Sequence, residues 1–277
     1  MTRLFGVLGH PISHSLSPAM HTAALRALRL DALYTAFDVP PRHLRPVLKA
    51  LILSGVEGIN VTVPLKQAVV PLLDRLDPSA RRLGAVNTIV VKRRRTSGYN
   101  TDGAGFRRAL AELGWRRRAG HAVLLGAGGA ARAVAWELAA AGHRLTIANR
   151  HLARAQSLAR WLARRGVDAR AVPLSQAPVA QADLLVNATT VGMRPGDGLP
   201  ADCSRLRRET MVYDLVYHRE TPLVRLARRR GCVAAGGASM LLYQGAESLR
   251  LWLRREPPVA AMRQALAAAL RAARARG

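Results

Sequence analysis

The chain has 277 residues, 43 of them Lys or Arg and 17 Asp or Glu, so its formal net charge is +26, and 49% hydrophobic residues exclude a disordered chain. Its length predicts about two domains, its 2 cysteines exclude a disulfide framework, and the lack of an apolar run of roughly 18 residues excludes a membrane helix. The Met1–Gly9 stretch is too short for a signal peptide, so we expect a cytoplasmic protein without a membrane partner.

The first hundred residues alternate between strand-like and helix-like segments. Strand-like runs cover 4–8, 33–39, 58–63, 88–91 and 96–99, and helical patterns cover 18–28 and 43–53 and begin again at Pro64. The last two strand-like runs flank a basic run and predict a hairpin. This rhythm predicts an α/β domain whose sheet is mainly parallel.

A second unit is predicted from about residue 120. Its strand-like runs cover 121–125, 145–148, 184–188, 211–216 and 233–235, and its helical patterns cover 130–140 and 152–164. The stretch from Ser239 to Arg274 consists almost entirely of helix-forming residues and is broken at Pro257–Pro258. The alternation again indicates a parallel sheet covered by helices.

The positive charge first suggests nucleic acid as a partner. Lysine occurs only at 49, 66 and 92, so arginine supplies the other 40 cations, as a genome-wide codon bias would produce. The basic runs Lys92–Arg95, Arg116–Arg118 and Arg228–Arg230 fall at a predicted turn and near helix ends, without interleaved aromatic residues. We therefore expect no specific nucleic-acid partner, only adhesion to polyanions that salt weakens. Neither Cys203 nor Cys232 lies near a cluster of metal-ligating residues, so we expect no metal.

A glycine-rich turn follows the strand predicted at 121–125. Gly126-x-Gly128-x-x-Ala131 matches the dinucleotide-binding fingerprint between a strand and a helix. The first glycine permits the turn, the second lets the backbone approach a pyrophosphate, and Ala131 allows close packing of the helix on the strand. The helix N-terminus would offer free N–H groups to the phosphates.

The end of the next strand distinguishes NADP from NAD. An NAD site places an acidic residue there, but this chain has Asn149-Arg150, with Arg154 four residues beyond Arg150. A guanidinium group suits the 2′-phosphate of NADP, which a carboxylate would repel. The sequence therefore favours NADP, although an arginine can stand here by chance in so arginine-rich a chain.

A polar loop from Gly9 to Pro18 joins a predicted strand to a predicted helix. Ser15 and Ser17 alternate in it, so both hydroxyls can face one side, beside the unsatisfied N–H groups of the helix start. This arrangement suits a carboxylate or hydroxyl ligand. The alternative is that Ser17 only caps the helix that opens at Pro18.

More polar residues stand at other strand ends. Thr62 and Lys66 flank the strand that stops before Pro64, at the edge where open α/β sheets bind ligands. A lysine at a helix N-terminus is electrostatically unfavourable, and unlike arginine it can release a proton. Asn87 and Asp102 bring further polar groups to the ends of two other predicted strands, Asn87 before 88–91 and Asp102 after 96–99. The alternatives are that Lys66 is an exposed surface residue and that Asp102 caps the next helix.

These motifs together resemble the shikimate dehydrogenase family over nearly the whole chain. The resemblance rests on Gly9–Pro18, Asn60–Lys66, Gly84–Thr88, Asn100–Gly103, Gly126–Arg132, Asn149–Arg150, Asn187–Thr189 with Gly192–Met193, Asp214 with Tyr217 and Thr221–Leu223, and Gly237–Gly245. It implies two α/β domains: a substrate domain at 1–103, a Rossmann-type NADP domain at 104–235, and C-terminal helices at 236–277 that return to the first domain. A homodimer is left open.

The resemblance also implies a reaction and its residues. The family reduces 3-dehydroshikimate to shikimate with NADPH, on the route to chorismate and the aromatic amino acids. Lys66 would be the general acid/base at the C3 oxygen, assisted by Asp102, because hydride addition leaves an alkoxide that needs a proton donor. Ser15, Ser17 and Tyr217 would hold the substrate carboxylate, and Thr62, Asn87, Asp102 and Gln244 the ring hydroxyls.

The implied NADP residues come from several segments. They are Gly126, Ala127, Gly128, Gly129, Ala130 and Ala131 in the turn; Asn149, Arg150, His151 and Arg154 near the 2′-phosphate; and Thr189, Met193, Leu215, Gly237 and Met240 at the nicotinamide end.

Three departures from the family and two alternative functions remain. His151 replaces a common Thr, the Tyr217–Thr221 segment is about one residue short and lacks the common proline, and Pro195–Gly198 has no assigned role. A quinate or aminoshikimate dehydrogenase has the same fold, but the quinate/NAD type usually has an acidic residue in the Asn149 region. A catalytically silent, nucleic-acid-binding relative would be expected to lose Lys66 or Asp102, and both are present.

Overall fold

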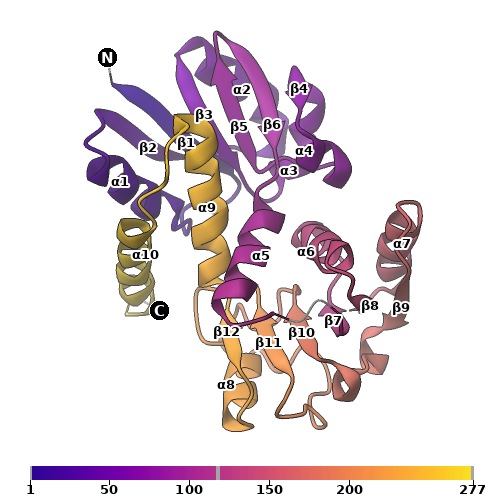
Figure 1. Cartoon of the computed structure of the whole chain (residues 1–277). Helices are drawn as coiled ribbons and strands as arrows, with labels where there is room; N and C mark the ends of the chain where they lie inside the picture. Colours follow the sequence, from indigo (N-terminus) through magenta and orange to yellow (C-terminus); the bar gives the residue numbers. More distant parts are fainter. Residues whose placement is uncertain (1, 117–118, 276–277) are drawn as a thin grey trace. The chain divides into compact units, whose positions relative to one another are not determined.

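The chain folds into two units (Figure 1). The structure, a computed structural model, describes residues 2–116 and 119–275, so part of the predicted Arg116–Arg118 run lies outside the described residues. The first unit contains the described residues up to Gly105 and from Leu242 on, and the second contains those within Phe106–Leu241. No helix in the described ranges is long and apolar enough to cross a membrane.

The first unit has a mixed six-stranded sheet in the order β2-β1-β3-β5-β6-β4. The strands are β1 (Arg3–Gly9), β2 (Ala32–Asp38), β3 (Val56–Val61), β4 (Arg75–Leu76), β5 (Thr88–Lys92) and β6 (Arg95–Tyr99). β1 pairs in parallel with β2 and β3, whereas β5 runs antiparallel to β3 and β6. The carboxyl ends of β1 and β3 therefore meet, and the Thr62 N–H donates to the Leu8 carbonyl at 2.8 Å.

Helices cover this sheet. They are α1 (Ser17–Ala27), α2 (Leu44–Leu53), α3 (Leu65–Ala68), α4 (Pro78–Leu83), the start of α5 (Asp102–Glu112), most of α9 (Ala238–Leu253), and α10 (Val259–Arg274). α10 packs on α1, and Trp252 of α9 donates its indole N–H to the Ile89 carbonyl of β5 at 2.9 Å. The long C-terminal helical segment is thus two helices separated at Pro257–Pro258, as predicted, and it joins the N-terminal sheet.

A hydrophobic core lies between the sheet and its helices. Leu8, Ile59, Leu65 and Ile89 are fully buried in it. Burying each such side chain stabilises the unit by about 1.5–3 kcal/mol before the entropy cost of ordering it.

The second unit has an all-parallel six-stranded sheet in the order β12-β11-β10-β7-β8-β9. The strands are β7 (His121–Leu125), β8 (Arg144–Asn149), β9 (Ala169–Pro173), β10 (Leu184–Asn187), β11 (Met211–Asp214) and β12 (Ala234–Gly236), with helices α6 (Gly129–Ala140), α7 (Leu152–Ala163) and α8 (Pro222–Arg229). The strand order reverses between β7 and β10, which is the point where such sheets bind ligands.

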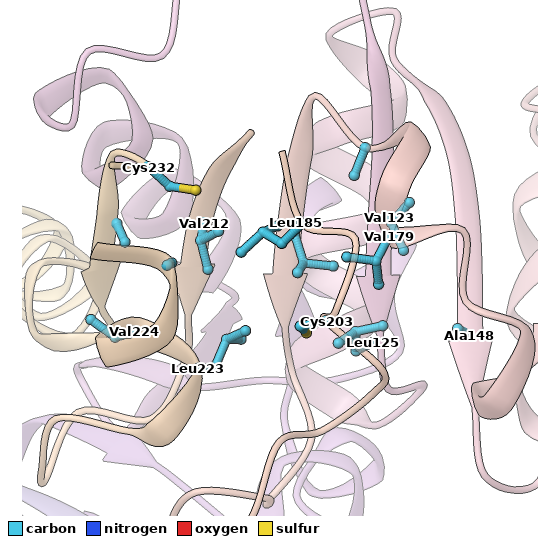
Figure 2. Packing of buried hydrophobic residues seen from close by; sticks show 14 of the residues in the cluster. Val123, Leu125, Ala148, Val179, Leu185, Cys203, Val212, Leu223, Val224 and Cys232 are labelled. Atoms are coloured by element: carbon cyan, nitrogen blue, oxygen red, sulfur yellow. The ribbon is translucent and has the colours of Figure 1, made fainter. Parts of the chain in front are cut away.

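Buried residues from the central strands fill this unit (Figure 2). Val123, Leu125, Leu185 and Val212 pack together with Leu223 of α8. β7 and β10 are buried along their whole length, which explains why each reads as a continuous apolar run.

Some predicted boundaries are wrong. The strand predicted at 58–63 is β3 (Val56–Val61), because the chain leaves the sheet before Pro64. The strand predicted at 211–216 stops at Asp214. The helix predicted to open at Pro64 is the four-residue α3. A helix this short has a weak dipole, so a lysine near its start is not strongly unfavourable. The position of Lys66 at a helix start therefore no longer argues for a special role.

Candidate active site

Lys66 and Asp102 form an ion pair in the first unit. Lys66 Nζ donates to Asp102 Oδ2 at 2.6 Å, and the side chains are 22% and 8% exposed, respectively. The ammonium group is thus partly open to solvent while the carboxylate is buried. The alternative that Lys66 is an exposed surface residue is wrong, because its side chain is only 22% exposed.

Two asparagines fix the position of Asp102. Asn87 Nδ2 donates to Asp102 Oδ1 at 2.8 Å, so each carboxylate oxygen has its own partner. Asn100 Oδ1 accepts the Asp102 N–H at 3.1 Å, at the first residue of α5. Asn100 thus holds the backbone at the start of α5, and the Asp102 carboxylate contacts Lys66 and Asn87 from there.

The pair ends a buried polar network. Asn87 Oδ1 accepts the Thr101 N–H at 2.8 Å, and Asn87 Nδ2 lies 3.4 Å from Gln244 Oε1 of α9. Behind Asn87, Asn60 Nδ2 donates to Ser248 Oγ at 2.9 Å. Side chains from β3, β5, α5 and α9 thereby hold one another, so the pair sits on a constrained support.

Tyr34 of β2 closes the other end of this network, and no sequence motif pointed to this residue. Its hydroxyl donates to Asn60 Oδ1 at 2.8 Å. Burial raises the pKa of Tyr34 well above its usual value, and a hydrogen bond with Ser17 opposes that effect. Tyr34 is therefore linked through Asn60 to Asn87, whose carbonyl accepts from Asn60 Nδ2 at 3.1 Å.

The loop that contains Ser15 and Ser17 was expected either to bind a ligand or to provide a helix cap at Ser17, and the structure contradicts the cap. Ser17 is the first residue of α1 and Leu16 is its N-cap, with no side-chain capping bond, so Ser17 is not the cap. The Ser17 N–H instead lies 3.4 Å from Ser15 Oγ. Ser15, in the loop after β1, and Thr62, directly after β3, are both half-buried.

The glycine-rich turn of the second unit has the predicted geometry. Gly126 adopts φ +106°, and a Cβ there would lie 2.9 Å from the Ala188 carbonyl group, so only glycine fits. Gly128 is the N-cap of α6, and no atom lies within 4 Å of where a Cβ of Gly128 or Gly129 would stand. Ala131 is fully buried. The turn thus leaves room at the start of α6, beside Ala127 and Ala130, which are half-buried.

The end of β8 presents basic side chains to solvent. Arg150, His151 and Arg154 are exposed, and Asn149 Nδ2 donates to the His151 carbonyl at 2.9 Å. His151 is the N-cap of α7 and makes no side-chain capping bond. The structure therefore provides two arginines and no carboxylate at this strand end, the arrangement expected for a 2′-phosphate.

A hydrogen-bonded loop follows β10. Asn187 Oδ1 accepts from Thr189 Oγ1 at 2.7 Å, and Asn187 Nδ2 donates to Asp214 Oδ1 at 2.9 Å. Asp197 Oδ2 accepts the Gly192 and Arg194 N–H groups at 2.8 and 2.9 Å. This assigns the Pro195–Gly198 loop a role that the sequence did not show: Asp197 closes the turn that presents the exposed Met193.

The remaining residues expected at the nicotinamide end follow β11 and β12. The Leu215 N–H donates to the Asn187 carbonyl at 2.8 Å, and the Met240 N–H donates to Tyr213 Oη at 3.1 Å. A Cβ at Gly237 would overlap the Leu215 carbonyl oxygen, so this close approach requires glycine. Within the described residues, no group of three or more His, Cys, Asp or Glu could hold a metal ion.

Comparisons with known proteins agree with this arrangement. The family model described as "Shikimate dehydrogenase substrate binding domain" matches residues 7–89, "Shikimate / quinate 5-dehydrogenase" matches 109–193, and "Shikimate 5'-dehydrogenase C-terminal domain" matches 237–267. The chain is 48% identical to "Shikimate dehydrogenase (NADP(+))" of Moorella thermoacetica, over 97% of this chain and 94% of that protein. The chain belongs to the shikimate dehydrogenase family.

Solved structures of the family have the same fold. A crystal structure of a shikimate dehydrogenase in complex with NADP+ gives a TM-score of 0.92 at 37% identity and covers 97% of this chain and 96% of that chain. The Thermus thermophilus enzyme in complex with NADP(H) and shikimate gives 0.88 at 41% identity, covering 97% and 100%. The two-domain α/β prediction is thereby confirmed.

Tyr217 differs from the other substrate residues that the resemblance to the shikimate dehydrogenase family implies, because those all lie in the first unit. It belongs to the second unit, is half-buried and packs its ring against His218 at 3.9 Å between centroids. Burial raises the pKa of its hydroxyl. The structure brings Lys66, Asn87, Asp102 and Gln244 together within the first unit, and the part of Tyr217 stays a prediction.

Proposed function

We propose that the chain catalyses the reversible, NADP-dependent reduction of 3-dehydroshikimate to shikimate. The observation that carries the proposal is the Lys66–Asp102 pair, with its Nζ–Oδ2 distance of 2.6 Å, in a chain of this family. A partly exposed ammonium group on a buried carboxylate is suited to give a proton to an oxygen and to recover it from solvent.

We propose the following roles for the chain's own residues. NADPH, when bound, supplies the hydride for the C3 carbonyl carbon. As the carbonyl electron pair moves onto the oxygen, Lys66 donates a proton to that oxygen and stabilises its developing charge. Asp102 holds Lys66 in place, and Asn87 holds Asp102. In the reverse direction Lys66 accepts the hydroxyl proton.

Substrate recognition is proposed for polar groups around this pair. The hydroxyls of Ser15 and Ser17, with that of Tyr217, would hold the carboxylate, and Thr62, Asn87 and Gln244 the ring hydroxyls. Ser17 is buried at the first residue of α1, which supports a fixed position for one of the serines. Residues 1–103 and 236–277 would thus supply most of the substrate contacts, with Tyr217 added from residues 104–235, which would supply most of the cofactor contacts.

The cofactor residues present fit NADP. Open space at Gly128 and Gly129 suits a pyrophosphate at the start of α6. The exposed Arg150 and Arg154 suit a 2′-phosphate. A quinate- and NAD-using enzyme is the alternative, and the lack of an acidic residue after β8 argues against it.

One assay distinguishes these functions. Purified protein is mixed with shikimate or quinate and with NADP+ or NAD+, and cofactor reduction is followed by absorbance. The proposal expects rapid reduction only with shikimate and NADP+. Preference for quinate or NAD+ would be consistent with the proposed Lys66–Asp102 chemistry but would contradict the proposed substrate or cofactor specificity. No reduction with any combination would contradict the proposed enzymatic activity.

A further inference from the structure

A cavity of about 980 Å³ lies on the first unit, and none of the residues proposed for shikimate or NADP lines it. One wall is formed by β4 and the β5–β6 hairpin, and the other by the end of α9 and the residues after it. We name this cavity the basic groove after the six cationic residues that line it: Arg75, Lys92, Arg95, Arg250, Arg254 and Arg255.

The positive charge of the basic groove is poorly compensated. Only two acidic residues line it, Asp74 and Glu256. Asp74 Oδ2 accepts the Thr96 N–H and hydroxyl at 2.8 Å each, and its contact with Arg95 is long, at 3.4 Å. The Asp74 carboxylate is therefore committed mainly to Thr96.

Among the cations, Arg250 is paired with Glu247 outside the groove lining. Within the ranges that the structure describes, Arg75, Lys92, Arg254 and Arg255 have no ion pair, and all four side chains are exposed. The two walls thus line one cavity with four cations that make no ion pair, against the carboxylate of Glu256. Such a field concentrates an anion of high charge.

The dimensions and chemistry select the ligand class. The volume of about 980 Å³ falls in the range of small-molecule sites. Guanidinium groups bind phosphate oxygens through paired hydrogen bonds, and a lysine adds a point charge. A single carboxylate would leave most of these cations unpaired. Tyr99 and Leu251 add an aromatic and an apolar surface to the lining.

We propose that the basic groove binds a compact oligophosphate, such as the phosphate chain of a nucleotide. This inference does not depend on the proposed function, because the groove and the Lys66–Asp102 pair share no residue. The test uses the full chain and inorganic triphosphate as the probe, measured by isothermal titration calorimetry at moderate salt.

The variants compare equal charge changes at two places. Lys92→Glu with Arg255→Glu reverses two charges in the basic groove. Arg45→Glu with Lys49→Glu reverses one arginine and one lysine on the exposed face of α2 in the same unit, outside the basic groove. A third variant, Arg150→Ala with Arg154→Ala, removes the proposed 2′-phosphate residues. Thermal unfolding checks that each variant is folded.

The proposal expects one triphosphate bound per chain. The affinity should fall at least about tenfold in the groove variant and less than about threefold in the other two variants. Several equivalents bound with equal losses in the groove and α2 variants would mean general adhesion to a basic protein and would overturn it. Loss mainly in the Arg150/Arg154 variant would move the binding to the cofactor site. A short DNA duplex that binds more tightly than triphosphate, and is lost in the groove variant, would assign the groove to nucleic acid instead.

Discussion

Lys66 Nζ donates to Asp102 Oδ2 at 2.6 Å, while Asn87 occupies the other oxygen of the same carboxylate. The lysine is thereby held by a group whose own orientation is fixed from behind. A proton donor that must meet a carbonyl oxygen benefits from such preorganisation, because little reorientation is left for the reaction itself.

Replacing Lys66 by alanine should lower kcat by about 10²-fold or more and change KM little, as loss of a general acid does. Steady-state kinetics with shikimate and NADP+ measure both constants. Lys49→Ala is the matched control, since Lys49 is an exposed lysine on α2. An unchanged kcat in Lys66→Ala would remove Lys66 from the mechanism.

Arg150→Ala should weaken NADPH binding far more than NADH binding, because only NADPH has the 2′-phosphate that the guanidinium group would hold. Dissociation constants for both nucleotides, measured by fluorescence titration, give the comparison. Arg160→Ala, an exposed arginine farther along α7, should leave both constants unchanged. Equal losses for the two nucleotides would mean that Arg150 does not distinguish them.

His151→Thr should stabilise the chain by about 1 kcal/mol, the usual contribution of a side-chain N-cap. His151 is the N-cap of α7 with φ −96° and ψ 97°, and it makes no side-chain capping bond. A threonine hydroxyl at this position can accept one of the free N–H groups of the first turn. Urea unfolding measures the gain, and His151→Ala separates loss of the imidazole from gain of the cap: if both variants unfold at the same urea concentration, the cap does not form.

Much of the fold is predictable because buried parallel strands are continuous apolar runs. β7 (His121–Leu125) was predicted to the residue, and β8 and β10 nearly so. β4 (Arg75–Leu76) was missed because two residues carry no pattern. β9 (Ala169–Pro173) was missed because it is an edge strand with one buried residue and a terminal proline.

Site residues could be predicted from the sequence where they belong to a short motif. They could not be predicted where segments far apart in the sequence come into contact. Lys66, Asn87 and Asp102 stand at strand ends, and the structure brings them together. Tyr34 and Ser248 are separated from Asn60 by 26 and 188 positions, and only folding places them in contact. No local pattern distinguishes Ser248 from any other polar residue of α9.

The contribution of Asp214 to the free energy of unfolding should fall as pH rises. Burial raises the pKa of this carboxyl, against hydrogen bonds from Thr221, Val216 and Asn187. Because the folded value exceeds the unfolded value near 3.8, the folded state keeps its proton while the unfolded state loses it as pH rises through this interval, and the Asp214 contribution to stability falls. The unfolding free energy of Asp214→Asn minus that of the wild type should therefore increase from about pH 4 upward.

Urea titrations at several pH values measure this difference. Asp168→Asn is the control, because Asp168 is an exposed carboxylate of the same unit. A difference that stays constant with pH for Asp214→Asn, or that changes equally in Asp168→Asn, would show that the Asp214 carboxyl is not what couples folding to protonation.

Substitutions in the β5–β6 turn should stabilise the chain against unfolding. Lys92 pairs with Arg95, and the two residues between them, Arg93 and Arg94, have φ +48° and +63°. Left-handed backbone costs an ordinary residue about 1–2 kcal/mol, and Asn-Gly is the preferred pair in such two-residue turns. Arg93→Asn with Arg94→Gly should therefore raise the unfolding midpoint. Arg93→Ala with Arg94→Ala removes the same two charges but keeps the backbone cost, so it should gain much less. Equal midpoints for the two double variants would trace any gain to reduced charge repulsion and not to the backbone.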